Sequence, residues 1–146
     1  MALVPRILGV DYGRKRTGLA VSDALGMMAH PLPTHEGPPD LAISAIASLV
    51  KDRDVARVVV GLPLSMDGTD SDMTREVRTF AARLAAALGA AVTVELQDER
   101  LSSAGAEDAL REIGLKPSKN KSRIDAMAAC ELVRAALGGA GGNPVA

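Results

Sequence analysis

The sequence predicts an α/β fold in which helices flank a mixed sheet of five strands. Three short apolar segments joined by tight connections come first, at residues 6–10, 18–22 and 27–32. Helical patterns then alternate with two continuous apolar segments, at residues 58–62 and 91–96. Tight connections favour antiparallel neighbours, whereas a strand, helix, strand order favours right-handed crossovers between parallel neighbours. The sheet is therefore expected to be mixed.

The helices are predicted from apolar residues that recur on one face. Asp40 can cap a first helix. The residues on the apolar face of that helix are Ala42, Ile46, Leu49 and Val50. The clearest pattern begins at Met73 and ends at Gly89, with apolar residues at steps of four, three and one. A third helix is expected from Ser102 or Ser103 to Ile113, and a last one from about 122 to 137.

A chain of 146 residues is long enough for one hydrophobic core. We assign residues 1–137 to a single domain and residues 138–146, with four glycines and a proline, to a flexible tail. No stretch resembles a signal peptide, and none approaches the roughly 20 apolar residues of a membrane helix. Because a single cysteine, Cys130, cannot form an intramolecular disulfide, we expect a cytoplasmic protein.

The distribution of charge is more informative than its sum. A formal net charge of −1 excludes a uniformly basic surface. Basic residues nevertheless form one cluster at Arg14-Lys15-Arg16 and a second at Lys116, Lys119, Lys121 and Arg123, within a segment that carries no acid. Such patches either bind phosphate groups or belong to two solvated loops.

Acidic residues lie at three places where a ligand site is expected. Asp11 ends the first strand, Asp98-Glu99 end the fifth, and Asp125 lies in the first turn of the last helix. Ligands in such sheets collect beyond the carboxyl ends of parallel strands. Carboxylate oxygens are the ligands that Mg²⁺ and Mn²⁺ prefer, and a pair of these ions supports phosphodiester cleavage. The residues therefore favour a divalent-metal site.

Two other kinds of site have less support. His30, His35 and Cys130 cannot make the usual structural zinc site. The G-x-S-x-G motif of Ser-His-Asp hydrolases does not occur.

Each acidic residue also has a structural explanation. Asp11 can stabilise the turn after its strand. Asp98-Glu99 can pair with Arg100 on the surface. Asp125, three residues after Ser122, can belong to a capping box at the start of the last helix. The residues alone leave these alternatives open.

Four blocks of sequence stand out in this order. They are Leu8-Gly9-Val10-Asp11-Tyr12-Gly13 with Arg16, Gly18, Ala20 and Ser22-Asp23; Val60-Gly61-Leu62-Pro63-Leu64 with Met66-Asp67-Gly68-Thr69; Asp98-Glu99-Arg100-Leu101-Ser102-Ser103; and Lys121 with Asp125-Ala126-Met127-Ala128-Ala129. Together they resemble the YqgF-like family of pre-16S ribosomal RNA nucleases, relatives of the bacterial Holliday junction resolvases, over nearly the whole chain.

This resemblance implies a ribonuclease H-like fold, nuclease chemistry with Mg²⁺ or Mn²⁺, and a role in maturing the 5′ end of small-subunit ribosomal RNA. It also implies that Asp11, Glu99 and Asp125 are the catalytic acids and metal ligands, with Asp98 as the other candidate for the middle place. The resolvase relatives have a further acid on the strand that matches residues 58–62, and this chain has none there. That departure argues against junction resolution more than against metal binding.

Residues near these blocks are candidates for binding nucleic acid. Ser65, Asp67 and Thr69, in the loop after the central strand, can contact the sugar-phosphate chain or simply form a turn. Tyr12 is expected to pack locally rather than stack on a base. The basic candidates for phosphate contacts are Arg14, Arg16, Arg100 and Lys121.

Three functions fit these residues. The favoured one is a metal-dependent nuclease acting on RNA, as a monomer or homodimer. The second is a Holliday junction resolvase-like DNA endonuclease, and the third is a non-catalytic RNA-binding module whose acids only cap helices and turns. A phosphotransfer ATPase of the actin and sugar-kinase type fits poorly, because those enzymes pair two such domains around the nucleotide.

Overall fold

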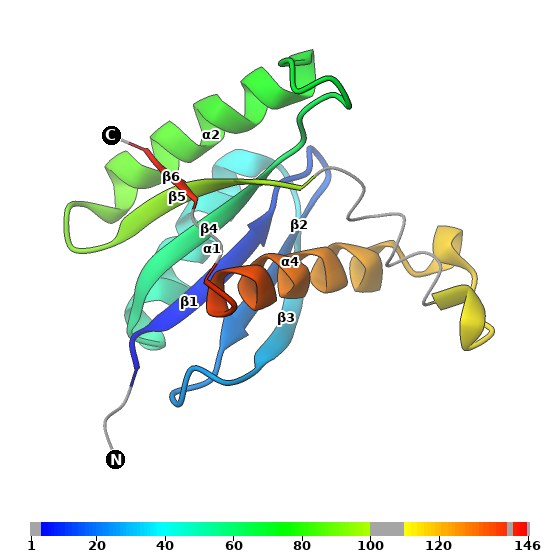
Figure 1. Ribbon diagram of the computed structural model, residues 1–146, viewed down its shortest axis with the longest axis horizontal. Coiled ribbons are helices and arrows are strands. Elements are labelled where there is room, and N and C mark those ends of the chain that lie inside the picture. Colours follow the sequence, from blue (N-terminus) through cyan, green and yellow to red (C-terminus); the bar gives the residue numbers. More distant parts are fainter. Residues whose placement is uncertain (1–3, 100–109, 140–141, 146) are drawn as a thin grey trace.

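A computed structural model describes residues 4–99, 110–139 and 142–145 of the chain. Its sheet has six strands in the order β3-β2-β1-β4-β5-β6 (Figure 1). The strands are β1 (Arg6–Asp11), β2 (Arg16–Ser22), β3 (Ala29–Glu36), β4 (Val55–Leu62), β5 (Thr93–Asp98) and β6 (Asn143–Pro144). The helices are α1 (Pro39–Asp52), α2 (Asp72–Leu88), the short 3-10 helix η1 (Pro117–Lys119) and α4 (Lys121–Leu137).

The sheet is mixed, as the sequence predicts. Strands β1, β2 and β3 form an antiparallel meander. Strand β4 runs parallel to β1, and β5 runs parallel to β4. The carboxyl ends of β1, β4 and β5 therefore meet at one edge of the sheet, where the acidic residues were expected to converge.

A sixth strand corrects two expectations. Strand β6 pairs antiparallel with β5, with Pro144 opposite Glu95, and the Val145 amide donates to the Val94 carbonyl over 2.8 Å. Val145 also packs against the main core. The expected count of five strands is therefore one too low, and residues 143–144 do not belong to a tail without regular structure. Two residues after a glycine-rich stretch show no periodicity from which a strand could be predicted.

Alternating side chains divide the core between the two faces of the sheet. Leu8 and Val10 of β1 belong to the main core with α1 and α2, whereas Ile7 packs with Leu132 and Ala136 of α4. Figure 1 shows α4 in front of the sheet and α1 behind it. Helices therefore cover both faces, as expected for an α/β fold.

Two glycines allow α4 to lie directly on the sheet. A Cβ atom on Gly9 would overlap the carbonyl oxygen of Ala129, and one on Gly18 would overlap the carbonyl of Asp125. Any larger side chain at these positions would push the helix away, because protein interiors have no spare volume. The glycines thus determine how close Asp125 comes to the strands.

The first helix has the predicted apolar face but a different cap. Its buried residues are Ala42, Ile46 and Val50. Its N-cap is Pro38, so the prediction that Asp40 caps the helix is wrong. Asp40 lies in the first turn and forms an ion pair with Arg83 of α2 at 2.6 Å.

The helix expected up to Ile113 lies mostly outside the described residues. Residues 110–112 are helical, and Gly114 follows with φ 82°, a conformation that favours glycine at a helix end. In the described part of the chain, no helix is long and apolar enough to cross a membrane.

Candidate functional site

Strand register brings Asp11 close to Asp125 of α4, which lies just after the first turn of the helix rather than in it as expected. Asp11 ends β1 and pairs with Gly18 of β2, and Gly18 lies in contact with Asp125 of α4. Gly9 of the same strand also faces α4, and side chains two residues apart on a strand share a face. Asp11 and Asp125 therefore occupy the same face of the sheet at the same end.

The third carboxylate belongs to Glu99, the residue that follows β5. Val10 pairs with Val60 of β4, so Gly61 follows beside Asp11. A Cβ atom on Gly61 would overlap the carboxylate of Glu99. The Glu99 amide donates to the Leu62 carbonyl over 3.2 Å, which anchors the backbone at this point. The absence of a side chain at Gly61 thus makes room for the Glu99 carboxylate.

The two candidates for the middle acidic position differ in their surroundings. Glu99 is half-buried and its side chain is hydrogen-bonded to Asp11. Asp98 is exposed at the end of β5. The geometry therefore brings Glu99 rather than Asp98 to Asp11.

The electrostatics of the cluster are unfavourable to negative charge. Burial and the charge of Asp125 together raise the pKa of Asp11 from 3.8 to about 7, although the hydrogen bond with Glu99 acts in the opposite direction. The side-chain hydrogen bond of Asp11 goes to another carboxyl group, which a residue stabilising a turn does not require.

Asp125 is positioned by Arg16. Its Oδ2 accepts a hydrogen bond from Arg16 Nε at 3.2 Å, and both side chains are about one-quarter exposed, at 25% for Arg16 and 23% for Asp125. Burial raises the pKa of Asp125, while the Arg16 guanidinium lowers it. One edge of Asp125 is therefore neutralised by a cation of the protein itself.

The capping-box explanation of Asp125 is wrong. The helix begins at Lys121, its N-cap is Asn120, and no side chain caps it. Ser122 lies inside the first turn and donates from Oγ to Glu36 Oε1 at 2.6 Å. The Ser122 carbonyl also accepts a hydrogen bond from Thr34 Oγ1 at 2.6 Å. These contacts tie the start of α4 to β3.

The donor set of the cluster suits a hard divalent cation. Mg²⁺ and Mn²⁺ prefer oxygen ligands, and the three carboxylates would supply both the oxygen atoms and negative charge. Among the described residues, however, no three acidic, histidine or cysteine side chains stand in a geometry that could hold an ion. Asp125 is turned toward Arg16 and Asp11 toward Glu99. Side-chain rotation would be needed to direct all three at one ion.

A positively lined pocket opens beside Asp125. Its volume is about 540 Å³, and its charged lining includes Arg16, Arg111 and Lys121. Lys121 also lies close enough to lower the pKa of Asp125. Two of the candidates for phosphate contacts, Arg16 and Lys121, are thus adjacent to the carboxylate cluster.

Arg14 and Tyr12 have local partners. Arg14 Nε lies 2.9 Å from Glu76 Oε2, in a surface ion pair to α2. The ring of Tyr12 packs on Phe80, with centroids 4.9 Å apart. Tyr12 therefore packs locally, as expected.

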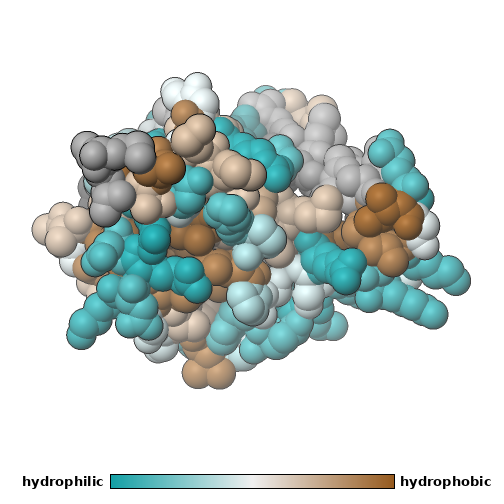
Figure 2. Space-filling view, turned by 90° about the horizontal axis from the view of Figure 1, so that it is seen from below, coloured by the Kyte–Doolittle hydropathy of each residue, from teal (hydrophilic) through white to brown (hydrophobic). Residues whose placement is uncertain are grey.

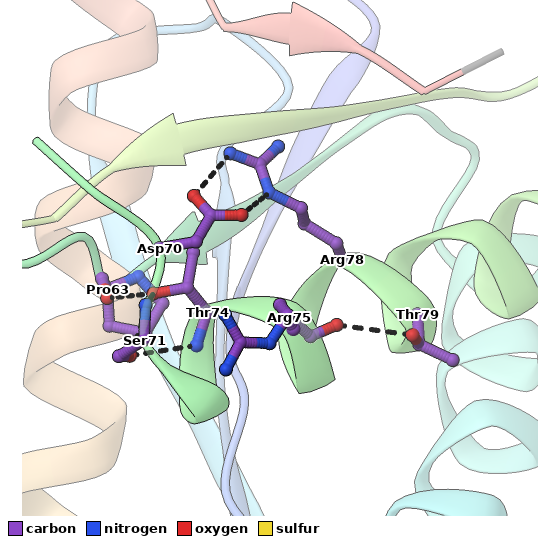
Figure 3. A network of polar contacts seen from close by, with 7 residues as sticks. All are labelled: Pro63, Asp70, Ser71, Thr74, Arg75, Arg78 and Thr79. Carbon is purple, nitrogen blue, oxygen red and sulfur yellow. Dashed lines mark hydrogen bonds and ion pairs between the residues drawn. The ribbon is translucent and has the colours of Figure 1, made fainter.

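The loop after β4 is held by contacts within itself and with α2. Asp67 Oδ1 accepts from the amide and hydroxyl of Thr69 at 3.0 and 2.6 Å, and the Ser65 amide donates to the Thr69 carbonyl at 3.0 Å. These bonds are those of a turn, the structural alternative for the three residues. Arg78 of α2 pairs with Asp70 at the end of the loop at 2.9 Å (Figure 3).

Thr74 joins the same loop to the helix. Ser71 and Thr74 form a capping box at the start of α2, and the buried Thr74 hydroxyl donates to the Pro63 carbonyl at 2.7 Å (Figure 3). The loop beside Asp11 is therefore fixed at both ends.

The sequence did not predict the roles of several residues of the site, and one predicted residue, Arg100, cannot be placed. Arg100 lies outside the described residues. The roles of Gly18 and Gly61 as spaces for acidic residues were not predicted, although both belong to the conspicuous motifs. Nothing in the sequence indicated that Glu36 would contact Ser122, because the two are 86 residues apart.

Comparison with known proteins gives consistent matches over most of the chain. A sequence model described as "RuvX: Holliday junction resolvase" matches residues 5–138. A protein of Chloroflexus aurantiacus named "Putative pre-16S rRNA nuclease" is 45% identical over 139 residues, 94% of this chain and 90% of its own. A protein of the same name from Anaeromyxobacter sp. (strain K) is 48% identical over 130 residues, 88% of this chain and 93% of its own.

A solved structure shares the fold. The structure of T. thermophilus RuvC in complex with a Holliday junction substrate has a TM-score of 0.55 at 16% sequence identity, and the match covers 97% of this chain and 100% of that one. This likeness confirms the ribonuclease H-like fold.

Proposed function

The chain belongs to the RuvX family, whose members are nucleases, and we propose that it hydrolyses phosphodiester bonds in the precursor of 16S ribosomal RNA. We place the reaction at Asp11, Glu99 and Asp125. The observation that carries this proposal is the convergence of three carboxyl groups from β1, the residue after β5, and α4, with burial and the charge of Asp125 raising the pKa of Asp11 to about 7. A substrate of this kind implies that the enzyme works in the cytoplasm.

We further propose that the three carboxylates hold Mg²⁺ or Mn²⁺. Such a cation would supply the positive charge that stabilises the phosphorus-centred transition state and acidifies the attacking water. The repulsion between Asp11 and Asp125 supports this proposal, because a doubly charged cation would remove it. Arg16, which pairs with Asp125, would contact the substrate phosphate from the neighbouring pocket together with Lys121.

Cleavage assays with single variants test the site. We expect Asp11→Asn, Glu99→Gln and Asp125→Asn each to abolish cleavage of an RNA that spans the 5′ end of 16S RNA and its precursor sequence. RNA binding should persist, since these groups act on the reaction rather than on affinity. Asp98→Asn is the matched control and should keep most of the activity. Loss of activity in Asp98→Asn with an active Glu99→Gln would overturn the assignment of the middle acid.

Thermal unfolding tests the metal proposal without relying on activity. Mn²⁺ or Mg²⁺ should raise the melting temperature of the wild-type protein, because a ligand selective for the folded state stabilises it by mass action. The same ions should have little effect on Asp11→Asn. An equal response of both proteins would mean that the ion binds elsewhere.

Junction resolution is the second candidate, because the matching family model is described as a Holliday junction resolvase. Strand β4 carries Gly61, and no acid, at the position beside Asp11. We therefore favour RNA as the substrate. Parallel assays with the RNA precursor and a four-way DNA junction distinguish the two, and faster cleavage of the junction would reverse this preference.

A further inference from the structure

Two adjoining pockets lie beside the carboxylate cluster along the start of α4, and together they are called the groove. The pocket beside Asp125 and a second pocket of about 390 Å³ share Arg16, Ser118 and Lys121 as lining residues. The second pocket extends the groove to Lys119 and Arg123. The groove thus begins at the acidic site and ends at cations that the proposed chemistry does not use.

The cations at the far end of the groove differ from the other basic residues of the structure. Most described arginines are paired with an acid, as in Arg14–Glu76, Arg57–Glu95, Arg75–Asp72, Arg78–Asp70, Arg83–Asp40 and Arg134–Glu131. Lys119 and Arg123 are exposed, and in the described part of the chain neither forms an ion pair.

The acid that lines this end of the groove has another partner. Glu36 accepts a hydrogen bond from Ser122 Oγ at 2.6 Å, a contact that fixes the start of α4 against β3. Glu36 and Asp125 are the two acids among the lining residues, whereas five basic residues line the groove: Arg16, Arg111, Lys119, Lys121 and Arg123. The groove therefore has an excess of positive charge although the whole chain has a formal net charge of −1. Figure 2 shows hydrophilic side chains projecting at the right-hand end of the molecule, where η1 and the start of α4 lie in Figure 1.

We propose that Lys119 and Arg123 bind the sugar-phosphate backbone of the substrate strand as it leaves the carboxylate cluster. This inference rests on the proposed function, and it adds a binding surface that serves affinity and strand placement rather than chemistry. Unpaired cations in an open groove suit the evenly spaced negative charges of a nucleic-acid backbone. Because the lining offers cations and hydroxyl groups but no described aromatic side chain, the contact is independent of base sequence.

Binding measurements at several salt concentrations test the groove. The probe is a fluorescein-labelled RNA hairpin with a single-stranded 5′ extension, measured by anisotropy in EDTA so that no cleavage occurs. Each phosphate contact contributes about −0.7 to −0.9 to the slope of log Kobs against log salt. The double variant Lys119→Gln/Arg123→Gln should therefore reduce the magnitude of the slope by roughly 1.4 to 1.8. A second hairpin with permuted bases should lose affinity equally.

The matched control has the same change of net charge on another part of the surface. Lys51→Gln/Arg134→Gln removes two exposed cations of α1 and α4 that do not line the groove. It should leave the slope unchanged. Equal slopes for the groove variant and the wild type, or equal losses in the groove and control variants, would overturn the proposal. If the double variant fails to fold, Lys119→Gln alone should still reduce the magnitude of the slope by roughly 0.7 to 0.9, the contribution of one phosphate contact.

Kinetics separate this proposal from the proposed function. The groove variant should raise KM for the RNA precursor while kcat at saturating RNA stays near the wild-type value. A fall in kcat without a change in KM would contradict a role in affinity. If the wild-type protein binds RNA and the groove variant shows the predicted loss of slope, but no RNA is cleaved, the proposed function is wrong while the proposed binding surface is supported.

Discussion

Replacing Asp11 by asparagine should stabilise the protein at high pH and have little effect at low pH. The folded state holds the pKa of Asp11 at about 7, compared with 3.8 for the ordinary group. A carboxyl group with a raised pKa favours folding when it is protonated, so its ionisation reduces stability as the pH rises from about 4 to 7. Asparagine cannot ionise, and its side-chain amide can still form a hydrogen bond with Glu99.

The magnitude follows from the pKa difference. A rise from 3.8 to about 7 corresponds to about 4 kcal/mol of destabilisation above pH 7, taken as an upper bound. Typical domains are stable by about 5–15 kcal/mol, so the effect is large. With a urea m-value of about 2 kcal/mol per molar, Asp11→Asn should raise the unfolding midpoint at pH 8 by up to about 2 M. At pH 4 the two proteins should unfold at nearly the same urea concentration.

Urea unfolding followed by circular dichroism at pH 4, 6 and 8, without divalent ions, measures this difference. Asp52→Asn, which removes an exposed carboxylate at the end of α1, serves as the control and should not widen the gap between pH 4 and pH 8. The reasoning is refuted if Asp11→Asn and the wild-type protein show the same dependence of midpoint on pH. In that case burial and the charge of Asp125 would not raise the pKa of Asp11 in the folded state.

Further variants test the packing that positions the site. Gly61→Ala should lower cleavage at least tenfold with a small change in melting temperature, because the added methyl meets the flexible Glu99 carboxylate rather than backbone. Gly18→Ala should destabilise the protein by about 1–3 kcal/mol in urea unfolding, since its methyl meets the backbone of Asp125, and an unaltered midpoint would show that α4 can move without penalty. Thr74→Val should lower the free energy of unfolding by about 1–3 kcal/mol, because it leaves the Pro63 carbonyl and the Ser71 amide without partners. A loss below about 0.5 kcal/mol would mean that this hydroxyl does not hold the loop.

Arg16 connects Asp125 to the neighbouring pocket. Arg16 occupies one carboxylate oxygen of Asp125 and also lines the pocket beside it. A substrate phosphate that binds Arg16 would compete with Asp125 for the same guanidinium group. If the proposed site is correct, binding of substrate and release of Asp125 toward a cation would therefore be linked through the Arg16 side chain.

Periodicity and turn residues determined most of the fold. The meander, the crossover from β4 to the parallel neighbour β5, and the helix that ends at Gly89 follow from local patterns of apolar residues, because burial on one face repeats every two residues in a strand and every three to four in a helix. The expectation that the earlier crossover also joins neighbours is wrong, because β4 pairs with β1 and not with β3. Cap positions were less predictable: Asp40 suited a cap in sequence but lies inside the turn. Strand β6 was missed because two residues have no period and pair only with a strand already in place.

The sequence by itself supplied the acidic residues Asp11, Glu99 and Asp125 and their positions near the ends of elements. Only the tertiary structure decided that Glu99 rather than Asp98 meets Asp11, that Gly61 gives it room, and that Arg16 holds Asp125. These outcomes depend on strand register and on the distance between α4 and the sheet. Such distances arise from packing between segments far apart in the chain, about which local composition carries no information.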